Sequence, residues 1–338
     1  MRIVLVGFGV VGRSFAELVQ SDHVKLAKDF GLKPKIVGVA DAKGAAFDRD
    51  GIDLSAAVGS KKASGTLSGL GPDVYREGMT GSDLIREAEC EVVVESTPTE
   101  IMRGEPGLSH LRLAMKEGRH VICTNKGPLA IAMPALIELA NHNGVVFKFS
   151  GTVGGGTPVL DFAKKCLDGS QIHSIKGILN GTSNYILTRM AAEGIDMGPA
   201  LADAQRLGYA EADPTYDIEG LDTACKLVIT SNYILGTSLS VKDVAVRGIT
   251  KVSAEDIASA KAAGDTIKLI GSVDGKATVA PVRIPMTHPL NVSGTFNAIS
   301  FDTRPAGEMT LVGKGAGGPE TASSVLRDLI EIRRAFAR

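Results

Sequence analysis

One segment, Gly7-Phe8-Gly9-Val10-Val11-Gly12, constrains the fold of this chain more than any other. It directly follows a strand-like run, Ile3–Val6, and opens a stretch with helical apolar spacing. The first glycine permits a tight turn, the second lets the backbone approach a pyrophosphate, and the third lets helix and strand pack closely. The amides at the helix N-terminus then face the phosphates. The pattern therefore predicts that these six residues bind a dinucleotide.

Short β-branched runs alternate with helical stretches over residues 1–150. Such runs indicate strands buried on both faces of a parallel sheet, and a Gly-, Ser- and Lys-rich stretch, Ser55–Pro72, predicts a surface loop. The sequence thus favours an α/β fold, a Rossmann-type doubly wound parallel sheet. We expect its strands at Ile3–Val6, Ile36–Ala40, Val92–Val94, His120–Cys123 and Val145–Phe149.

A glycine-rich hinge, Ser150–Pro158, marks the start of a second domain. We expect an α+β second domain over residues 151–304. A second glycine turn, Gly315–Gly317, and a helix from Thr321 to about Phe336 indicate that the segment from about residue 305 to 338 returns to the first domain. The expected elements of the second domain are strands at Ile172–Leu179 and Val279–Ile284, and helices at Leu221–Ile234 and Ala254–Ala263.

Composition narrows the class of partner. Lys plus Arg (37) against Asp plus Glu (38) leaves a net charge of −1, which gives no global electrostatic case for nucleic acid or an anionic membrane. The N-terminus lacks a signal-peptide pattern, and no apolar run approaches the ~18–20 residues of a membrane span. The four cysteines show no Cys-x-x-Cys spacing, which favours reduced thiols. We therefore expect a cytoplasmic protein with no nucleic-acid or membrane partner.

Asp41, at the end of the second expected strand, is the candidate reader of the cofactor ribose. Its charge would repel a 2′-phosphate, which favours NAD(H). Three lysines in nearby loops could instead turn toward that phosphate, so NADP(H) stays open: Lys43, Lys61 and Lys62. Lys126 follows another strand end, where cofactor or substrate contact is expected.

Asp222 and Lys226 stand four residues apart, so they share one face of a helix. The residues around them are apolar, and a helix that is apolar nearly all round is buried. A buried carboxylate and ammonium are costly without a task or good partners, which indicates function. A partly desolvated lysine could deliver a proton to oxygen while a hydride moves at carbon. Glu211, Asp217 and Asp222 suit a cationic substrate group such as an amine.

With these motifs the chain resembles homoserine dehydrogenase over nearly its whole length. The resemblance rests on the glycine loop and on five further segments: Glu95–Pro98, Thr124–Lys126, Thr152–Gly156, Leu179–Leu187 and Gly208–Lys226. It implies reduction of L-aspartate 4-semialdehyde to L-homoserine with NAD(P)H, on the route to threonine, methionine and isoleucine. It also implies that the second domain, residues 151–304, binds the substrate and forms a homodimer through its sheet.

The resemblance implies a role for each matching residue. Lys226 would donate the proton, Asp222 would hold the hydroxyl side of the substrate, and Glu211 would bind its amino group. Gly181, Thr182, Tyr209 and Asp217 would line the same pocket, and further cofactor contacts would fall at Thr97, Lys126, Gly208 and Gly317. A monovalent cation, usually sodium, would bind the carbonyls of Val153, Gly155 and Thr157. The family often has glutamate where this chain has Ser150, so the cation would rely on carbonyls and a hydroxyl.

Three alternatives remain. The chain could be a Rossmann dehydrogenase for a different amino acid, or an aldehyde-oxidising relative with Cys123 as nucleophile, although no histidine base is evident near it in sequence. It could also be a regulatory protein that binds NAD without turnover, which would have no use for a buried Asp222–Lys226 pair. Only Ala337 and Arg338 follow the last expected helix. We therefore expect no separate effector domain and little inhibition by threonine.

Overall fold

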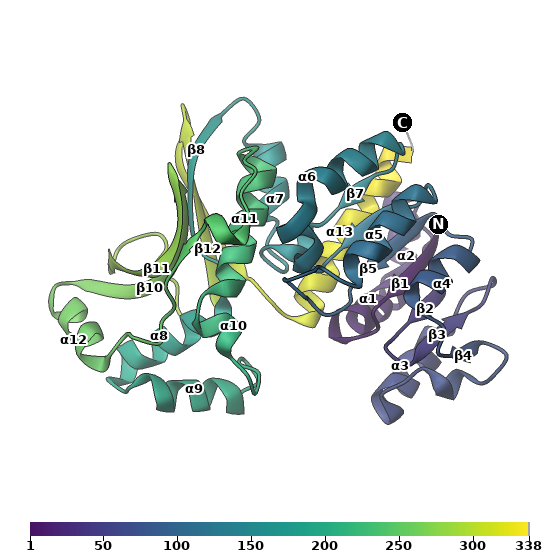
Figure 1. Cartoon of the computed structure of the whole chain (residues 1–338), viewed down its shortest axis with the longest axis horizontal. Helices are drawn as coiled ribbons and strands as arrows, with labels where there is room; N and C mark the ends of the chain where they lie inside the picture. The colour runs from purple at the N-terminus through teal and green to yellow at the C-terminus, as the bar shows by residue number, and fades with distance from the viewer. Residues whose placement is uncertain (337–338) are drawn as a thin grey trace. The chain divides into compact units, whose positions relative to one another are not determined.

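The computed structural model describes residues 1–336, which form two compact units. Unit 1 comprises Met1–Thr152 and the C-terminal segment from Gly317, and unit 2 comprises Val153–Ala316. Figure 1 shows a sheet with helices in each unit. The α/β class is confirmed, because unit 1 contains a largely parallel sheet and unit 2 contains a second sheet with its own helices.

Unit 1 is built on a seven-stranded sheet of order β4-β3-β2-β1-β5-β6-β7. The first strand, β1, pairs in parallel with β2 on one side and β5 on the other, so the strand order reverses at β1. Ligands of such sheets bind outside the carboxyl ends of the strands at this reversal. The strands are β1 (Arg2–Val6), β2 (Lys35–Ala40), β3 (Gly44–Phe47), β4 (Tyr75–Glu77), β5 (Val92–Glu95), β6 (His120–Cys123) and β7 (Phe147–Lys148).

Helices cover both faces of this sheet, and the C-terminal helix α13 packs beside α1 although the two are far apart in sequence (Figure 1). Their apolar faces join the strands in one buried core that includes Phe8 and Phe15. The helices of unit 1 are α1 (Val10–Ser21), α2 (His23–Phe30), α3 (Leu54–Ser64), η1 (Ser68–Leu70), α4 (Gly81–Glu87), α5 (Gly107–Lys116), α6 (Lys126–His142), η2 (Ser150–Thr152) and α13 (Gly318–Phe336).

Two sequence expectations need correction. Residues 55–72 do not form a loop, because α3 and η1 occupy most of them and the Asp53 carboxylate caps α3 by accepting from the Ala56 N–H at 3.0 Å. Residues 307–314 form a strand that pairs with β12 of unit 2, so the return to unit 1 starts at Gly317 rather than near residue 305. Ala337 and Arg338, which follow the last expected helix, lie outside the described residues.

Unit 2 contains a six-stranded sheet of order β13-β12-β8-β10-β11-β9, antiparallel except for the β9–β11 pair. Its strands are β8 (Gln171–Ile178), β9 (Ala245–Val246), β10 (Asp265–Asp274), β11 (Lys276–Pro285), β12 (Phe296–Arg304) and β13 (Gly307–Lys314). Its helices are α7 (Val159–Asp161), η3 (Phe162–Cys166), α8 (Gly181–Glu193), α9 (Met197–Arg206), α10 (Thr215–Ile218), α11 (Leu221–Ile234), η4 (Val241–Asp243) and α12 (Ala254–Ala262).

The helix α11 lies along one face of this sheet. Ten successive residues, Asp222–Ser231, are buried, as the apolar surroundings of the acid–lysine pair predicted. A Cβ atom built on Gly271 of β10 would lie 3.1 Å from Cγ2 of Thr223 on α11, so glycine lets the helix approach the strand closely.

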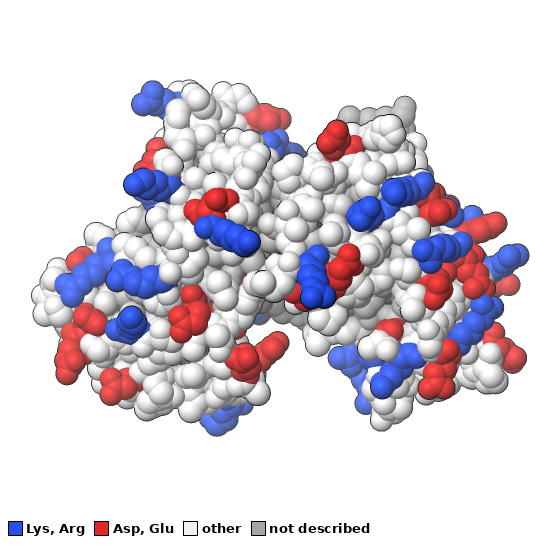
Figure 2. All heavy atoms as spheres, viewed as in Figure 1, with Lys and Arg blue, Asp and Glu red and all other residues white. Residues whose placement is uncertain are grey.

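The surface carries both signs of charge. Figure 2 shows basic and acidic side chains interspersed over the visible face, in keeping with the balanced composition. Among residues 1–336, no helix combines the length and apolarity that crossing a membrane requires.

Candidate active site

The glycine loop of unit 1 has the geometry that the sequence predicted. Gly7 adopts a φ of 97°, and a Cβ atom there would lie 2.5 Å from the carbonyl carbon of Ser96. A Cβ on Gly12 would lie 2.4 Å from the Gly7 oxygen, whereas one on Gly9 would meet nothing within 4 Å. Gly7 and Gly12 are therefore needed for packing inside the protein, and Gly9 leaves open space for a ligand.

The side chains of the loop differ in role. Phe8 is 1% exposed and belongs to the core, so its side chain is not open to a ligand. Val10, 61% exposed, is the first residue of α1, and Val11 packs partly buried against the core. Arg13 donates from Nε to the Gly9 oxygen at 3.3 Å, which adds a positive charge beside the loop that the sequence analysis missed.

The other cofactor candidates of unit 1 gather at the same edge of the sheet. A Cβ on Gly7 would lie 2.6 Å from the Thr97 nitrogen, and Lys126 is the first residue of α6. Gly317 immediately precedes α13, and the next residue, Gly318, would bring a Cβ within 2.6 Å of the Val10 side chain. The end of β5 and the start of α13 thus lie beside the glycine loop, and the end of β6 lies on the far side of β5 at the same edge.

Asp41 follows β2, and its carboxylate has partners within the protein that the sequence did not predict. Its Oδ1 accepts from the backbone N–H groups of Lys43 at 2.8 Å and Gly44 at 3.2 Å. Its Oδ2 pairs with the Lys61 ammonium at 2.6 Å, and the Asp41 side chain is only 3% exposed. Lys62 pairs elsewhere, with Glu17. Lys61 therefore offsets the negative charge that was expected to repel a 2′-phosphate.

In unit 2 the acid–lysine pair forms as expected. The Lys226 ammonium lies 2.8 Å from Oδ2 of Asp222 and donates to the Leu179 carbonyl at 2.7 Å, with both side chains buried. An ammonium has three N–H donors. Within the described part of the chain two of them have acceptors, which leaves one for a substrate oxygen.

Asn180 organises the carboxylates around this lysine. Its side-chain amide donates to Oδ2 of Asp222 at 2.9 Å and to Oδ1 of Asp217 at 2.6 Å. Burial, and then the negative charge of Asp222, raise the pKa of Asp217. Burial likewise raises the pKa of the Tyr216 hydroxyl, which lies 2.9 Å from the sulfur of Cys225. The site therefore brings two carboxyl groups together beside one ammonium.

The remaining substrate candidates, and the cofactor candidate Gly208, lie on one helix start and one loop of unit 2. Gly181 and Thr182 begin α8, where Thr182 donates to the Tyr209 carbonyl at 2.7 Å. Tyr209 is 46% exposed, and Glu211 and Gly208 are exposed on the loop after α9. Helix and loop are thus joined, and the Glu211 backbone carbonyl accepts from the Gln205 side-chain amide at 3.1 Å.

The segment expected to hold a cation contains unsatisfied buried oxygens. Oγ1 of Thr157 and both amide atoms of Asn297 are buried and have no hydrogen-bond partner among the described residues. Both residues line a small cavity in unit 2 together with Gly154. Ser150 belongs to unit 1, where its N–H donates to Asp328 at 3.0 Å. The expected carbonyl ligands, of Val153, Gly155 and Thr157, all lie in unit 2.

Cys123 is a poor nucleophile in this structure. It is 0% exposed, burial raises the pKa of its thiol well above the ordinary range, and its sulfur donates to the Asn125 carbonyl. The thiolate is the reactive form of cysteine. The geometry therefore disfavours the aldehyde-oxidising alternative.

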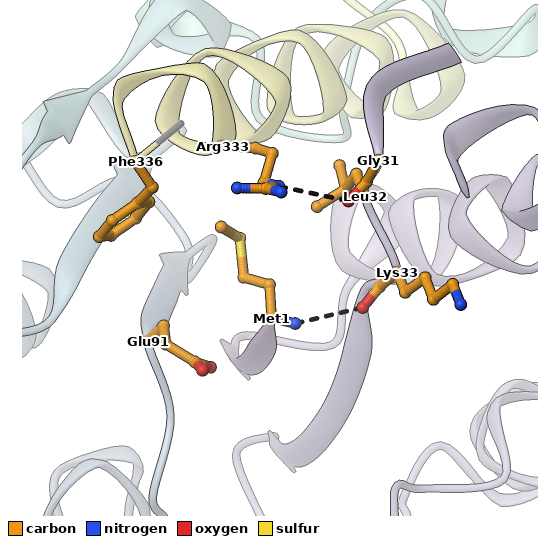
Figure 3. Close-up of a pocket in the computed structure, with 7 residues that line it drawn as sticks. All are labelled: Met1, Gly31, Leu32, Lys33, Glu91, Arg333 and Phe336. Carbon is orange, nitrogen blue, oxygen red and sulfur yellow. Dashed lines mark hydrogen bonds between the residues drawn. The ribbon is translucent and has the colours of Figure 1, made fainter. Parts of the chain in front are cut away.

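A different hollow of unit 1, about 340 Å³ in volume, lies near the N-terminal end of β1 (Figure 3). The Met1 ammonium donates to the Lys33 carbonyl there, and Arg333 donates to that of Gly31. Ligands of doubly wound sheets bind at the opposite, carboxyl edge. We therefore assign this hollow no part in cofactor binding.

Sequence reasoning missed several polar residues of both clusters. Ser96 donates to the Gly7 carbonyl at 2.6 Å, and Asn180 holds two carboxylates. Glu95, buried at the end of β5, contacts His110 of α5. Ser96, Asn180 and Glu95 lie in the segments on which the family resemblance rests, so the resemblance could have pointed to them. No sequence pattern pointed to His110, because its partner Glu95 lies on another element.

Comparisons with known proteins agree over both units. A family model described as homoserine dehydrogenase matches residues 158–330, and its NAD-binding domain model matches residues 7–150. A homoserine dehydrogenase of Methanocaldococcus jannaschii is 45% identical, with 98% of each chain covered. An NAD(+)-dependent homoserine dehydrogenase of Pseudomonas canavaninivorans is 40% identical over 100% of this chain and 97% of the relative.

Solved structures give the same result. A putative homoserine dehydrogenase of Archaeoglobus fulgidus superposes with a TM-score of 0.90 at 41% identity, covering 98% of this chain and 99% of the other. A hyperthermophilic archaeal homoserine dehydrogenase in complex with NADPH superposes with a TM-score of 0.86 at 29% identity, covering 99% and 98%.

Proposed function

Because the chain belongs to the homoserine dehydrogenase family of NAD(P)-dependent oxidoreductases, we propose that it reduces L-aspartate 4-semialdehyde to L-homoserine with Lys226 as the proton donor. The observation that carries the proposal is the buried Lys226–Asp222 pair, in which one ammonium N–H keeps no acceptor within the described residues. The reaction belongs to the supply of threonine, methionine and isoleucine.

The chemistry requires two transfers. A bound nicotinamide would supply a hydride to the aldehyde carbon, and a proton must reach the aldehyde oxygen as negative charge develops there. The Lys226 ammonium donates that proton, and Asp222 and the Leu179 carbonyl fix its direction through the other two N–H groups. In the reverse direction the neutral amine of Lys226 takes the hydroxyl proton of homoserine.

Substrate recognition rests on negative charge. Asp217 and Asp222, both held by Asn180, suit the ammonium and hydroxyl ends of an amino alcohol. Glu211 supplies a further exposed carboxylate, which we assign to the amino group. The Gly181–Thr182 start of α8 offers backbone N–H groups for the substrate carboxylate.

For the cofactor we propose NAD(H), with NADP(H) accepted or inhibitory. Gly9 leaves space for the pyrophosphate, and Asp41 lies at the end of β2, where the adenine ribose binds in such sheets. The Lys61–Asp41 pair gives the 2′-phosphate a partner as well. The relatives show both: one is named NAD(+)-dependent, and another was solved with NADPH.

The residues of the cation segment fit a monovalent ion. Hard oxygen ligands suit such ions, and Thr157 and Asn297 offer buried oxygens without partners in the described chain. We propose that sodium is held by the carbonyls of Val153, Gly155 and Thr157 with help from the Asn297 amide oxygen. Its role is to brace this segment of unit 2. We also propose a homodimer and a cytoplasmic location.

The experiment is the appearance of reduced nicotinamide when purified protein meets L-homoserine and NAD⁺ or NADP⁺. L-serine and other amino alcohols serve as matched substrates. We expect turnover with L-homoserine and far less with the others. Faster turnover of a different amino alcohol would contradict the proposal that L-homoserine is the substrate.

A further inference from the structure

The carboxylate of Glu95, at the carboxyl end of β5, is the most completely enclosed acidic group beside the glycine loop, with 0% exposure. Its Oε2 lies 2.7 Å from Nδ1 of His110, a residue of α5 that is 5% exposed. Its Oε1 accepts from the Thr97 N–H at 2.8 Å and also from the Thr97 hydroxyl. A buried carboxylate costs several kcal/mol unless its partners are well placed, and it is weak evidence for stability alone.

The contacts continue from Thr97 to the next strand end. The Asn125 amide donates to the Thr97 hydroxyl oxygen at 3.1 Å and to the Pro98 carbonyl at 3.2 Å. The amide oxygen of Asn125 accepts from the Gly127 N–H at 3.0 Å and so caps α6. One chain of side chains therefore runs from α5 through β5 to the start of α6, and each of its bonds lies at the edge where the cofactor candidates gather.

We propose that Glu95 and His110 are positioning residues for the cofactor. They fix the Thr97 turn and, through Asn125, the N-terminus of α6, so that both loops are set before the nucleotide binds. A contact that is set in advance loses less conformational entropy on binding. The proposal rests on the proposed dehydrogenase function, because that function supplies the cofactor that these loops meet.

A double-mutant cycle tests it. Glu95→Leu removes the acceptor at similar volume, and Thr97→Val removes the hydroxyl that it holds. We measure the Kd of NADH and NADPH from nucleotide fluorescence, with no amino acid present. If Glu95 acts through Thr97, each single variant weakens binding about tenfold, and the double variant is no weaker than either one. Effects that multiply, or an unchanged Kd in the folded Glu95→Leu protein, would overturn the proposal.

Two further variants complete the design. Where Glu95→Leu does not fold, His110→Leu decides, because it leaves the carboxylate in place but removes its hydrogen-bond partner. Weaker nucleotide binding supports the proposal, and unchanged binding contradicts it. Glu117→Gln, an exposed carboxylate at the far end of α5, is the matched control and should leave Kd unchanged. Wild-type turnover of L-homoserine tests the proposed function separately, because the cycle is read from nucleotide binding alone.

Discussion

The ionised carboxylate of Asp217 lowers the stability of the folded protein. Burial and the neighbouring Asp222 raise its pKa, so the folded state holds the proton more tightly than the unfolded state. Its stabilising effect is present in full below the ordinary aspartate pKa and is lost as the pH rises through the raised pKa. Ionised Asp217 is therefore unfavourable for the fold at neutral pH, which indicates that it is kept for binding.

We predict that Asp217→Asn raises the melting temperature by about 2 °C at about pH 7.5 and that the gain shrinks toward about pH 4. Thermal unfolding across this pH range is the measurement. Asp213→Asn is the control: hydrogen bonds from Thr215 lower the pKa of this exposed carboxyl, so its loss should show the opposite sign. A gain for Asp217→Asn that grows at low pH would contradict the argument.

Asp41 and Lys61 form the second prediction at this scale. Asp41→Ala frees the Lys61 ammonium for a 2′-phosphate, so the ratio of kcat/KM for NAD over NADP should fall about tenfold, a change of about 1.4 kcal/mol. Lys61→Ala is the matched variant and should raise the ratio, because it leaves the Asp41 charge uncompensated. Steady-state kinetics with both cofactors gives the answer. Ratios unchanged in both variants would remove Asp41 from cofactor recognition.

Among the helices and strands, the sequence predicted best those whose residues are buried in the core. The helix Leu221–Ile234 was predicted with its observed bounds, because apolar residues surround its two charges. The residues of α3 predicted a loop because glycine, serine and lysine are common there. The helix forms nonetheless, and the Asp53 carboxylate accepts a hydrogen bond from the Ala56 N–H at its N-terminus. The Glu95–His110 contact joins a strand to a helix through tertiary packing, which periodicity in one element does not report.

The turn between β1 and α1 gives the element-scale prediction. Gly9→Ala should leave stability within about 0.5 kcal/mol but weaken cofactor binding, because its Cβ enters open space that the pyrophosphate needs. Gly12→Ala should cost about 1–3 kcal/mol of stability, because its Cβ meets the Gly7 oxygen. Chemical denaturation and nucleotide titration separate the two effects. Unaltered nucleotide affinity in Gly9→Ala would contradict the assigned ligand space.

At the scale of the whole molecule, the two-unit division could be anticipated from the glycine-rich hinge, whereas the place of β13 could not. Residues 307–314 belong to unit 2 because they pair with β12. Which strands pair with each other cannot be deduced from the apolar pattern of one segment alone. That pairing also defines a sheet face. Val312 lies opposite Ala298, which lies opposite Ile178, and this face is turned away from α11.

That face carries the prediction about assembly. Val312, Phe296 and Val282 are 52%, 45% and 40% exposed on it, and exposed apolar side chains sharing one face mark protein contacts. We predict a homodimer in sedimentation experiments at micromolar concentration, and Val312→Asp should shift it toward monomer. Asp274→Asn, at the exposed end of β10, is the control. A monomeric wild-type protein would contradict the assignment.

Lys226 is the proposed proton donor, and the decisive measurement is the turnover of L-homoserine by Lys226→Met. We compare kcat per folded molecule with that of Lys268→Met, which removes another buried lysine of unit 2, one bonded to neutral acceptors such as the Val292 carbonyl. If Lys226 donates the proton, kcat falls ~10²–10⁴-fold in Lys226→Met, with cofactor affinity retained, and stays near wild type in Lys268→Met. Turnover of Lys226→Met within about tenfold of wild type would contradict it.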